Sequence, residues 1–307
     1  MNLERPTAQL KSKLPRHVIE ALAESLEDIG ERMSMERAVR EEAASPGTEF
    51  PYPNPVSPAL GERATAEDSV GIALVQSWAI AGHNMNIAEN NLVVTARLLK
   101  HGSDLFPPWS VYRHTCEHGA RAWDLLDPSL DAITRGRRGL VALRSGAEEA
   151  RRKAGEDEKG PAKAASQACE ELAQAAGFMD IRRDGPTDTS AVLKRMAGDQ
   201  TWPSRGIAVY HVLSALTHAD PYMHTRLMGV PPTSPSARAG TRASYVNDPI
   251  DTMARAGWGL FPLSLMLSVF YQAAQRQYEY YGWGSSGPLR TIADSISLVQ
   301  YHVTAEA

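Results

Sequence analysis

Five charged or ionisable side chains fall close together in the segment WSVYRHTCEHGARAWDLLDP, which begins at Trp109. They are Arg113, His114, Glu117, His118 and Arg121. Prolines just before this segment and at its end predict a helix over residues 108–127, because proline starts a helix well but cannot continue one. On that helix Arg113, Glu117 and Arg121 lie at i, i+4 and i+8, so they line one face beside the two histidines. This helix is the candidate functional element.

One interpretation of these residues is purely structural. Arginine and glutamate one helical turn apart form ion pairs, and such a pair contributes only ~0.3–0.5 kcal/mol when it is exposed. A ladder of Arg113, Glu117 and Arg121 beside two incidental histidines therefore requires no function. This alternative stays open on the sequence alone.

A second interpretation is a metal site, because His114, Glu117 and His118 spell H-x-x-E-H, the inverted zinc-protease pattern. Two imidazoles one turn apart can reach one metal ion, and the carboxylate between them can act as a base. Near the usual distance of the third ligand the sequence has Lys194, and Arg113 and Arg121 add positive charge beside the site. We therefore predict no metal and no cofactor, and keep a metal-dependent hydrolase as the second alternative.

A third interpretation comes from the pattern R-[N/D/H]-x-x-x-H, which Arg113, His114 and His118 fit. Here the chain resembles the HEPN-type helical ribonucleases of defence and toxin systems. The resemblance implies that the substrate is RNA, that His118 is catalytic and that Arg113 contacts the scissile phosphate. It also implies a homodimer in which the two chains together form one active site. The chemistry needs no metal, since an imidazole can move a proton and a guanidinium can hold a phosphate. Glu117 departs from the favourable pattern, because its negative charge opposes a phosphate.

A longer motif runs from Arg113 to Pro128 as R-x-x-x-E-x-x-x-R-A-W-x-L-L-D-P and continues into TRGRRGL. Together with a later tyrosine–serine–histidine helix it resembles a group of all-helical actinobacterial proteins over residues 105–220. The resemblance implies a helical fold and no particular activity. The group favours the arginine and glutamate positions over the two histidines, which weakens the ribonuclease interpretation. A metal-independent HEPN-like RNA endonuclease is still the leading specific hypothesis, and the first alternative is a non-catalytic regulatory bundle that binds a ligand or partner.

The later helix, predicted over residues 204–219, carries three polar side chains on one face: Tyr210, Ser214 and His218. A functional interpretation sets them opposite Arg113 and Glu117 around an internal polar pocket. A structural interpretation makes them a buried hydrogen-bond network that fixes how the two helices pack. Either way we predict a mostly buried polar seam between this helix and the helix over 108–127, with Arg121 and the three later residues as binding candidates.

Helical periodicity and caps predict an all-α fold, a single large bundle of eight to ten helices. The expected helices cover residues 15–44, 65–101 with a break near Gly82, 108–127, 129–154, 161–177, 188–197, 204–219, 249–281 and 289–303. The charged segment GEDEKGP is expected to be an exposed joint. The predicted organisation is an N-terminal helix (1–45), a proline-rich strap (46–62) and a bundle domain (63–307), with a second irregular segment at 229–247.

Composition limits the partners and the location. The net charge of -4 and the pI of about 6.2 exclude a global basic field, so RNA binding would need a local patch. The arginines at 135, 137 and 138, together with Arg151, Arg152 and Lys153, are interpreted as a solvated helix surface balanced by Glu148 and Glu149. Two cysteines and no apolar leader in the first residues favour a reducing compartment, the cytoplasm. The apolar segment 258–274 contains Pro262 and is predicted to be a core helix rather than a membrane span.

Overall fold

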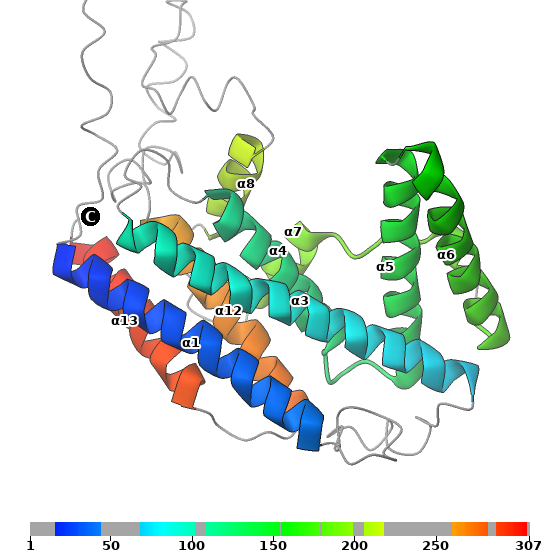
Figure 1. The fold of residues 1–307 in the computed structure, drawn as a ribbon, viewed down its shortest axis with the longest axis horizontal. Helices are drawn as coiled ribbons and strands as arrows, with labels where there is room; N and C mark the ends of the chain where they lie inside the picture. The colour runs from blue at the N-terminus through cyan, green and yellow to red at the C-terminus, as the bar shows by residue number, and fades with distance from the viewer. Residues whose placement is uncertain are drawn as a thin grey trace, which may run out of the picture.

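The computed structural model describes residues 16–43, 68–101, 109–153, 155–178, 180–198, 206–217, 260–281 and 287–305. These ranges form nine α-helices and one 3-10 turn, and they contain no strand (Figure 1). The α-helices are α1 (Arg16–Ala43), α3 (Ser69–Lys100), α4 (Trp109–Leu125), α5 (Ala132–Lys153), α6 (Glu156–Ala175), α7 (Thr189–Gly198), α8 (Gly206–Thr217), α12 (Leu260–Tyr280) and α13 (Gly287–Ala305). The turn η2 is Ile181–Arg183. The predicted all-α fold is confirmed.

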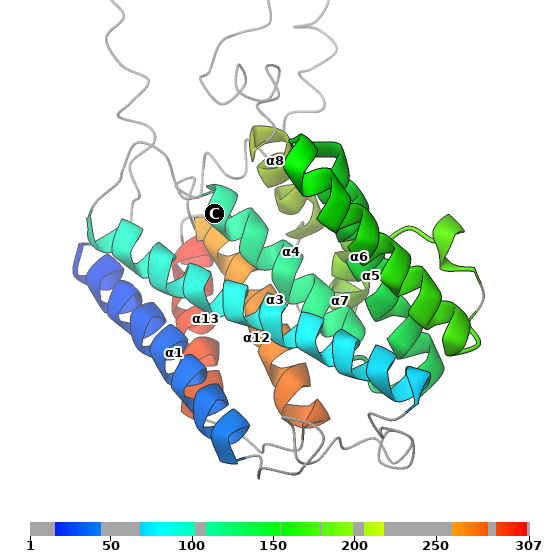
Figure 2. The ribbon, with the colours of Figure 1, turned by 45° about the vertical axis from the view of Figure 1, so that its right-hand side comes forward.

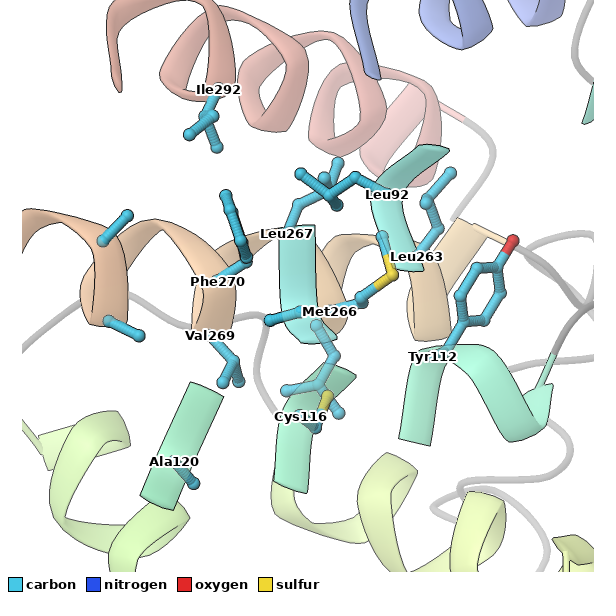
Figure 3. Packing of buried hydrophobic residues seen from close by; sticks show 14 of the residues in the cluster. Leu92, Tyr112, Cys116, Ala120, Leu263, Met266, Leu267, Val269, Phe270 and Ile292 are labelled. Atoms are coloured by element: carbon cyan, nitrogen blue, oxygen red, sulfur yellow. The ribbon is translucent and has the colours of Figure 1, made fainter. Parts of the chain in front are cut away.

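Helix α12 lies at the centre of the main core and is buried along most of its length. Figure 3 shows Phe270 beneath Ile292 of α13, while Val269 lies on the opposite side, toward Ala120 of α4. The approach of α4 is close, since a Cβ on Gly119 would lie 3.1 Å from a methyl group of Val269. The apolar segment is therefore a core helix, as predicted. Within the described ranges, no helix has both the length and the apolar character needed to cross a membrane.

The first helix belongs to the same core. The apolar stripe of this helix, formed by Leu22, Leu26, Ile29 and Met33, is almost completely buried. Helix α1 packs on α3 and α13, and Gly30 sets its approach to α3, because a Cβ there would lie 2.7 Å from a methyl group of Val93. Burial of this stripe, rather than intrinsic helix propensity, supplies most of the stabilisation of such a helix.

Helix α3 is continuous through Gly82, so the predicted break there is wrong. It begins at the cap residue Asp68, whose side chain accepts a hydrogen bond of 2.6 Å from the backbone N–H of Gly71. A glycine inside a helix costs only about 1 kcal/mol relative to alanine. Burial of α3 against both α1 and α4 outweighs that cost. One long helix thus joins the main core to the rest of the molecule.

Helices α5 and α6 form a hairpin beside the main core (Figures 1 and 2). The hairpin attaches where Gly139 of α5 packs on Ser77 of α3, and the Ser77 hydroxyl donates a 2.9 Å hydrogen bond to the Arg135 carbonyl. Helix α6 begins at Glu156 and includes Pro161, so most of GEDEKGP is helical rather than a joint. The described side chains of this segment are exposed, as predicted. Gly177 ends the hairpin with φ of 71°, a conformation that glycine adopts without a steric cost.

Several predicted features lie outside the described residues. They are the strap at 46–62, the irregular segment at 229–247, the beginning of the helix predicted over 249–281, and His218. The boundary predicted between the strap and the bundle domain also falls there.

Candidate functional site

The side chains of helix α4 contact three different parts of the molecule: the main core, α8 and α3. Tyr112, Cys116 and Ala120 face the main core and are almost completely buried (Figure 3). Arg113 and Glu117 lie on the flank covered by α8, which packs on α4. His118 lies on the other flank, against α3. The sequence of α4 thus produces a polar face whose two edges contact different helices.

Arg113, Glu117 and Tyr210 form a hydrogen-bonded group between α4 and α8. The Arg113 Nη2 atom lies 2.8 Å from Glu117 Oε1, and the two side chains are only 12% and 14% exposed. The Tyr210 hydroxyl donates to the same carboxylate oxygen at 3.2 Å. Burial, together with the negative charge of Glu117, raises the pKa of Tyr210 to about 12, although Arg113 opposes the shift, so the hydroxyl remains a donor. This contact agrees with the expected polar seam.

His118 is half-buried and bonds to α3, with 2.6 Å between its Nδ1 and Asn84 Oδ1. An amide oxygen only accepts, so Nδ1 carries the proton and donates. Burial, with smaller contributions from the nearby Arg121, His114 and His83, lowers the pKa of His118 to about 4, whereas Glu117 opposes the shift. His118 is therefore a neutral imidazole at pH 7.

The depressed pKa of His118 predicts a specific pH dependence of stability. Because the unfolded chain binds this proton near pH 6.5 and the folded chain only near pH 4, the free energy of unfolding falls as the pH drops between these values. We expect His118→Gln to flatten this fall when urea unfolding is measured at pH 7 and pH 5. The control His114→Gln, at an exposed position of the same helix, should keep it. An identical slope for wild type and His118→Gln would contradict the assignment.

The other predicted site residues do not join one cluster. His114 and Arg121 are exposed, and Arg121 makes no ion pair with Glu117, so the expected ladder stops at its first pair. Ser214 is partly buried on α8. Among the residues that the structure describes, no three His, Cys, Asp or Glu side chains are grouped to hold a metal ion. The three residues of the H-x-x-E-H pattern, His114, Glu117 and His118, therefore do not converge on one point.

A second polar cluster, missed by the sequence analysis, forms around Asp124 near the end of α4. Its side chain is 4% exposed, and its Oδ1 accepts from Arg138 of α5 at 2.7 Å and from Arg195 of α7. Its Oδ2 accepts from the Thr187 hydroxyl at 2.9 Å. One buried carboxylate thus links α4 to α5, α7 and the segment before α7. We call Asp124, Thr187, Arg138 and Arg195 the Asp124 cluster.

Aromatic stacking extends this cluster toward α12. The guanidinium of Arg276 lies 3.4 Å from the centre of the Trp123 ring, and that of Arg195 lies 5.5 Å from it. Arg276 also donates to the Trp123 carbonyl at 3.1 Å and lies 3.7 Å from the Asp127 carboxylate. Trp123, Asp124 and Asp127 therefore contact three arginines from three separate helices. These are Arg138 of α5, Arg195 of α7 and Arg276 of α12.

The prediction that Arg135 belongs to a solvated surface is wrong, because its side chain is completely buried. Its guanidinium donates to the carbonyls of Leu125, Asp127 and Leu130 at 2.9–3.3 Å and lies 4.7 Å from the Tyr280 ring centre. These carbonyls follow the end of α4, where Pro128 prevents further helical hydrogen bonds. The arginine of the TRGRRGL motif thus caps the preceding helix. The other two arginines of that motif, Arg137 and Arg138, pair with Asp184 and Asp124. Glu148 and Glu149 do balance the predicted surface, but they do so at Arg151 and Lys153.

Only one signal in the sequence pointed to the Asp124 cluster. Asp124 lies seven residues after Glu117, so a helix places it on the flank that Arg113 and Glu117 share. The partners of Asp124 come from α5, α7 and the segment before α7, and no local spacing in the sequence connects them. Comparison of the chain with protein families, with curated proteins and with solved structures found no match.

Proposed function

We propose that this protein is a non-catalytic helical bundle that binds a ligand or partner through the flank of α4 that α7 and α8 cover. The observation that carries the proposal is the divergence of Arg113 and His118. Arg113 bonds to Glu117 on the α8 side, whereas His118 bonds to Asn84 on the α3 side. Two groups that act on one reacting centre must face it together.

The chemistry of the two groups also favours binding over RNA cleavage. The Glu117 carboxylate neutralises the Arg113 guanidinium and repels a phosphate that approaches it. With a pKa of about 4, the His118 imidazole is a weak base, and at pH 7 it lacks the second proton that an imidazolium would release as a general acid. A metal-dependent hydrolase receives no support from the arrangement of His114, Glu117 and His118.

An RNA cleavage assay tests this proposal directly. Purified full-length protein is incubated with mixed RNA at pH 7, beside the variants His118→Ala and Arg113→Ala. We expect no cleavage by the wild type above either variant. Cleavage by the wild type that both substitutions abolish would overturn the proposal and establish the HEPN-like ribonuclease instead. In that case the site would require a second chain, so the oligomeric state of the active protein would have to be at least dimeric.

The cysteines support a reducing compartment such as the cytoplasm as the place of this function. Cys116 and Cys169 are both free thiols, and Cys116 is completely buried in the main core. Burial raises the pKa of Cys116, which keeps the thiol protonated and unreactive.

A further inference from the structure

We propose that the Asp124 cluster binds a phosphate group, either free phosphate or a phosphate monoester, at Arg138 and Arg195. The proposal rests on the binding function proposed above and names the ligand chemistry for the same flank of α4. It concerns the C-terminal half of that flank, where α5 and α7 both reach Asp124.

The first argument is the number of donors that remain available. A guanidinium has five N–H donors in a planar fork, which suits a carboxylate or a phosphate. Arg138 and Arg195 each donate once to the same oxygen, Asp124 Oδ1. Thr187 occupies the other oxygen, so the carboxylate cannot turn to bind either arginine with both of its oxygens. Within the described chain, the remaining donors of these two arginines have no side-chain or backbone acceptor.

The second argument is the balance of charge. Two arginines, Arg138 and Arg195, pair with the one carboxylate of Asp124, which leaves an excess of one positive charge. The carboxylate is 4% exposed, whereas the side chains of Arg138 and Arg195 are 31% and 42% exposed. A buried acid thus holds two arginines in place while part of each guanidinium meets solvent. Fixed, partly exposed arginines are the donors that phosphate recognition uses.

The third argument is preorganisation. Arg195 stacks near the Trp123 ring, and Asp124 bonds to elements that are far apart in the chain. Side chains that are already fixed lose little conformational entropy when a ligand binds. Arg121 and Arg152 are exposed arginines of α4 and α5 for which no such fixed arrangement is seen, so the argument applies to Arg138 and Arg195.

The test is isothermal titration of the full-length protein with inorganic phosphate and, separately, with ribose 5-phosphate, at constant ionic strength. We expect at least one of the two compounds to bind. The compound that binds more tightly indicates whether the natural ligand is free phosphate or a phosphate monoester. Arg195→Gln should weaken that binding tenfold or more, because it removes charge-assisted hydrogen bonds. Arg152→Gln removes the same charge from α5 and should leave binding unchanged. Circular dichroism melting verifies that each variant is folded.

The variant Asp124→Asn distinguishes a binding site from a structural cluster. It removes the competing negative charge and raises the charge excess from one to two, while the asparagine amide oxygen still accepts from Arg138 and Arg195 and keeps them in place, so phosphate should bind about fivefold to tenfold tighter. A merely structural role would predict no gain. If Asp124→Asn does not fold, the comparison of Arg195→Gln with Arg152→Gln decides. No binding of either ligand at 10 mM would overturn this inference, as would an equal loss of phosphate affinity in Arg195→Gln and Arg152→Gln. Neither outcome would bear on the proposed non-catalytic function, which the RNA cleavage assay tests separately.

Discussion

Replacing Gly139 by alanine should destabilise the protein by about 3 kcal/mol, at the upper end of what overpacking a core usually costs. A Cβ at this position would meet the Ser77 hydroxyl and would lie 2.8 Å from Ser77 Cβ and 2.9 Å from its Cα. Ser77 cannot turn away without loss, because its hydroxyl bonds to the carbonyls of Ala73 and Arg135. The helices α3 and α5 would have to move apart. Urea unfolding followed by circular dichroism measures the change.

Gly146→Ala is the matched control, since it makes the same substitution on the same helix with nothing within 4 Å of the new methyl group. It should stabilise the protein by about 0.5–1 kcal/mol through helix propensity alone. Adding Ser77→Gly to Gly139→Ala removes two of the three clashing atoms and should recover part of the loss. Equal unfolding free energies for Gly139→Ala and Gly146→Ala would show that α3 and α5 do not approach as closely as described.

Arg135→Ala should cost about 3–5 kcal/mol, the second large effect. The substitution removes the donors that satisfy three carbonyls after α4, and each buried carbonyl left unpaired costs about 1–3 kcal/mol. It also opens a cavity beside Tyr280, because Arg135 is fully buried. Arg135→Lys should recover only part of the loss, since an ammonium cannot reach three separate carbonyls as a planar guanidinium does.

The control is Arg152→Ala, which replaces an exposed arginine of the same helix. Substitutions at exposed positions usually change the free energy of unfolding by no more than about 0.5 kcal/mol, and we expect the same here. Thermal and urea unfolding of both variants give the comparison. A loss below 1 kcal/mol for Arg135→Ala would mean that water caps the end of α4 equally well. The expected losses at Gly139 and Arg135 have a common consequence, since both residues fix α5 and with it Arg138 at Asp124.

Local patterns in the sequence determined most of the secondary structure. Three patterns each predicted a helix that the structure contains: the helical periodicity of α1, the prolines around α4 and the apolar run of α12. The contact of Tyr210 with Glu117 also agrees with the predicted seam. These features depend on helical periodicity and on backbone hydrogen bonds within a few residues, which a sequence displays directly.

The sequence could not decide which neighbour covers each face of a helix, because contacts between distant segments depend on how all the helices pack together. Gly82 did not break α3, since packing against two helices outweighed its local cost. Arg135 looked like a surface residue and became a buried cap because its helix turns it toward the end of α4. Arg113 and His118 are close in sequence, yet they are separated because α8 covers one edge of α4 and α3 covers the other. Asp124 gained its partners only through the tertiary fold, which brings α5 and α7 to the same side chain.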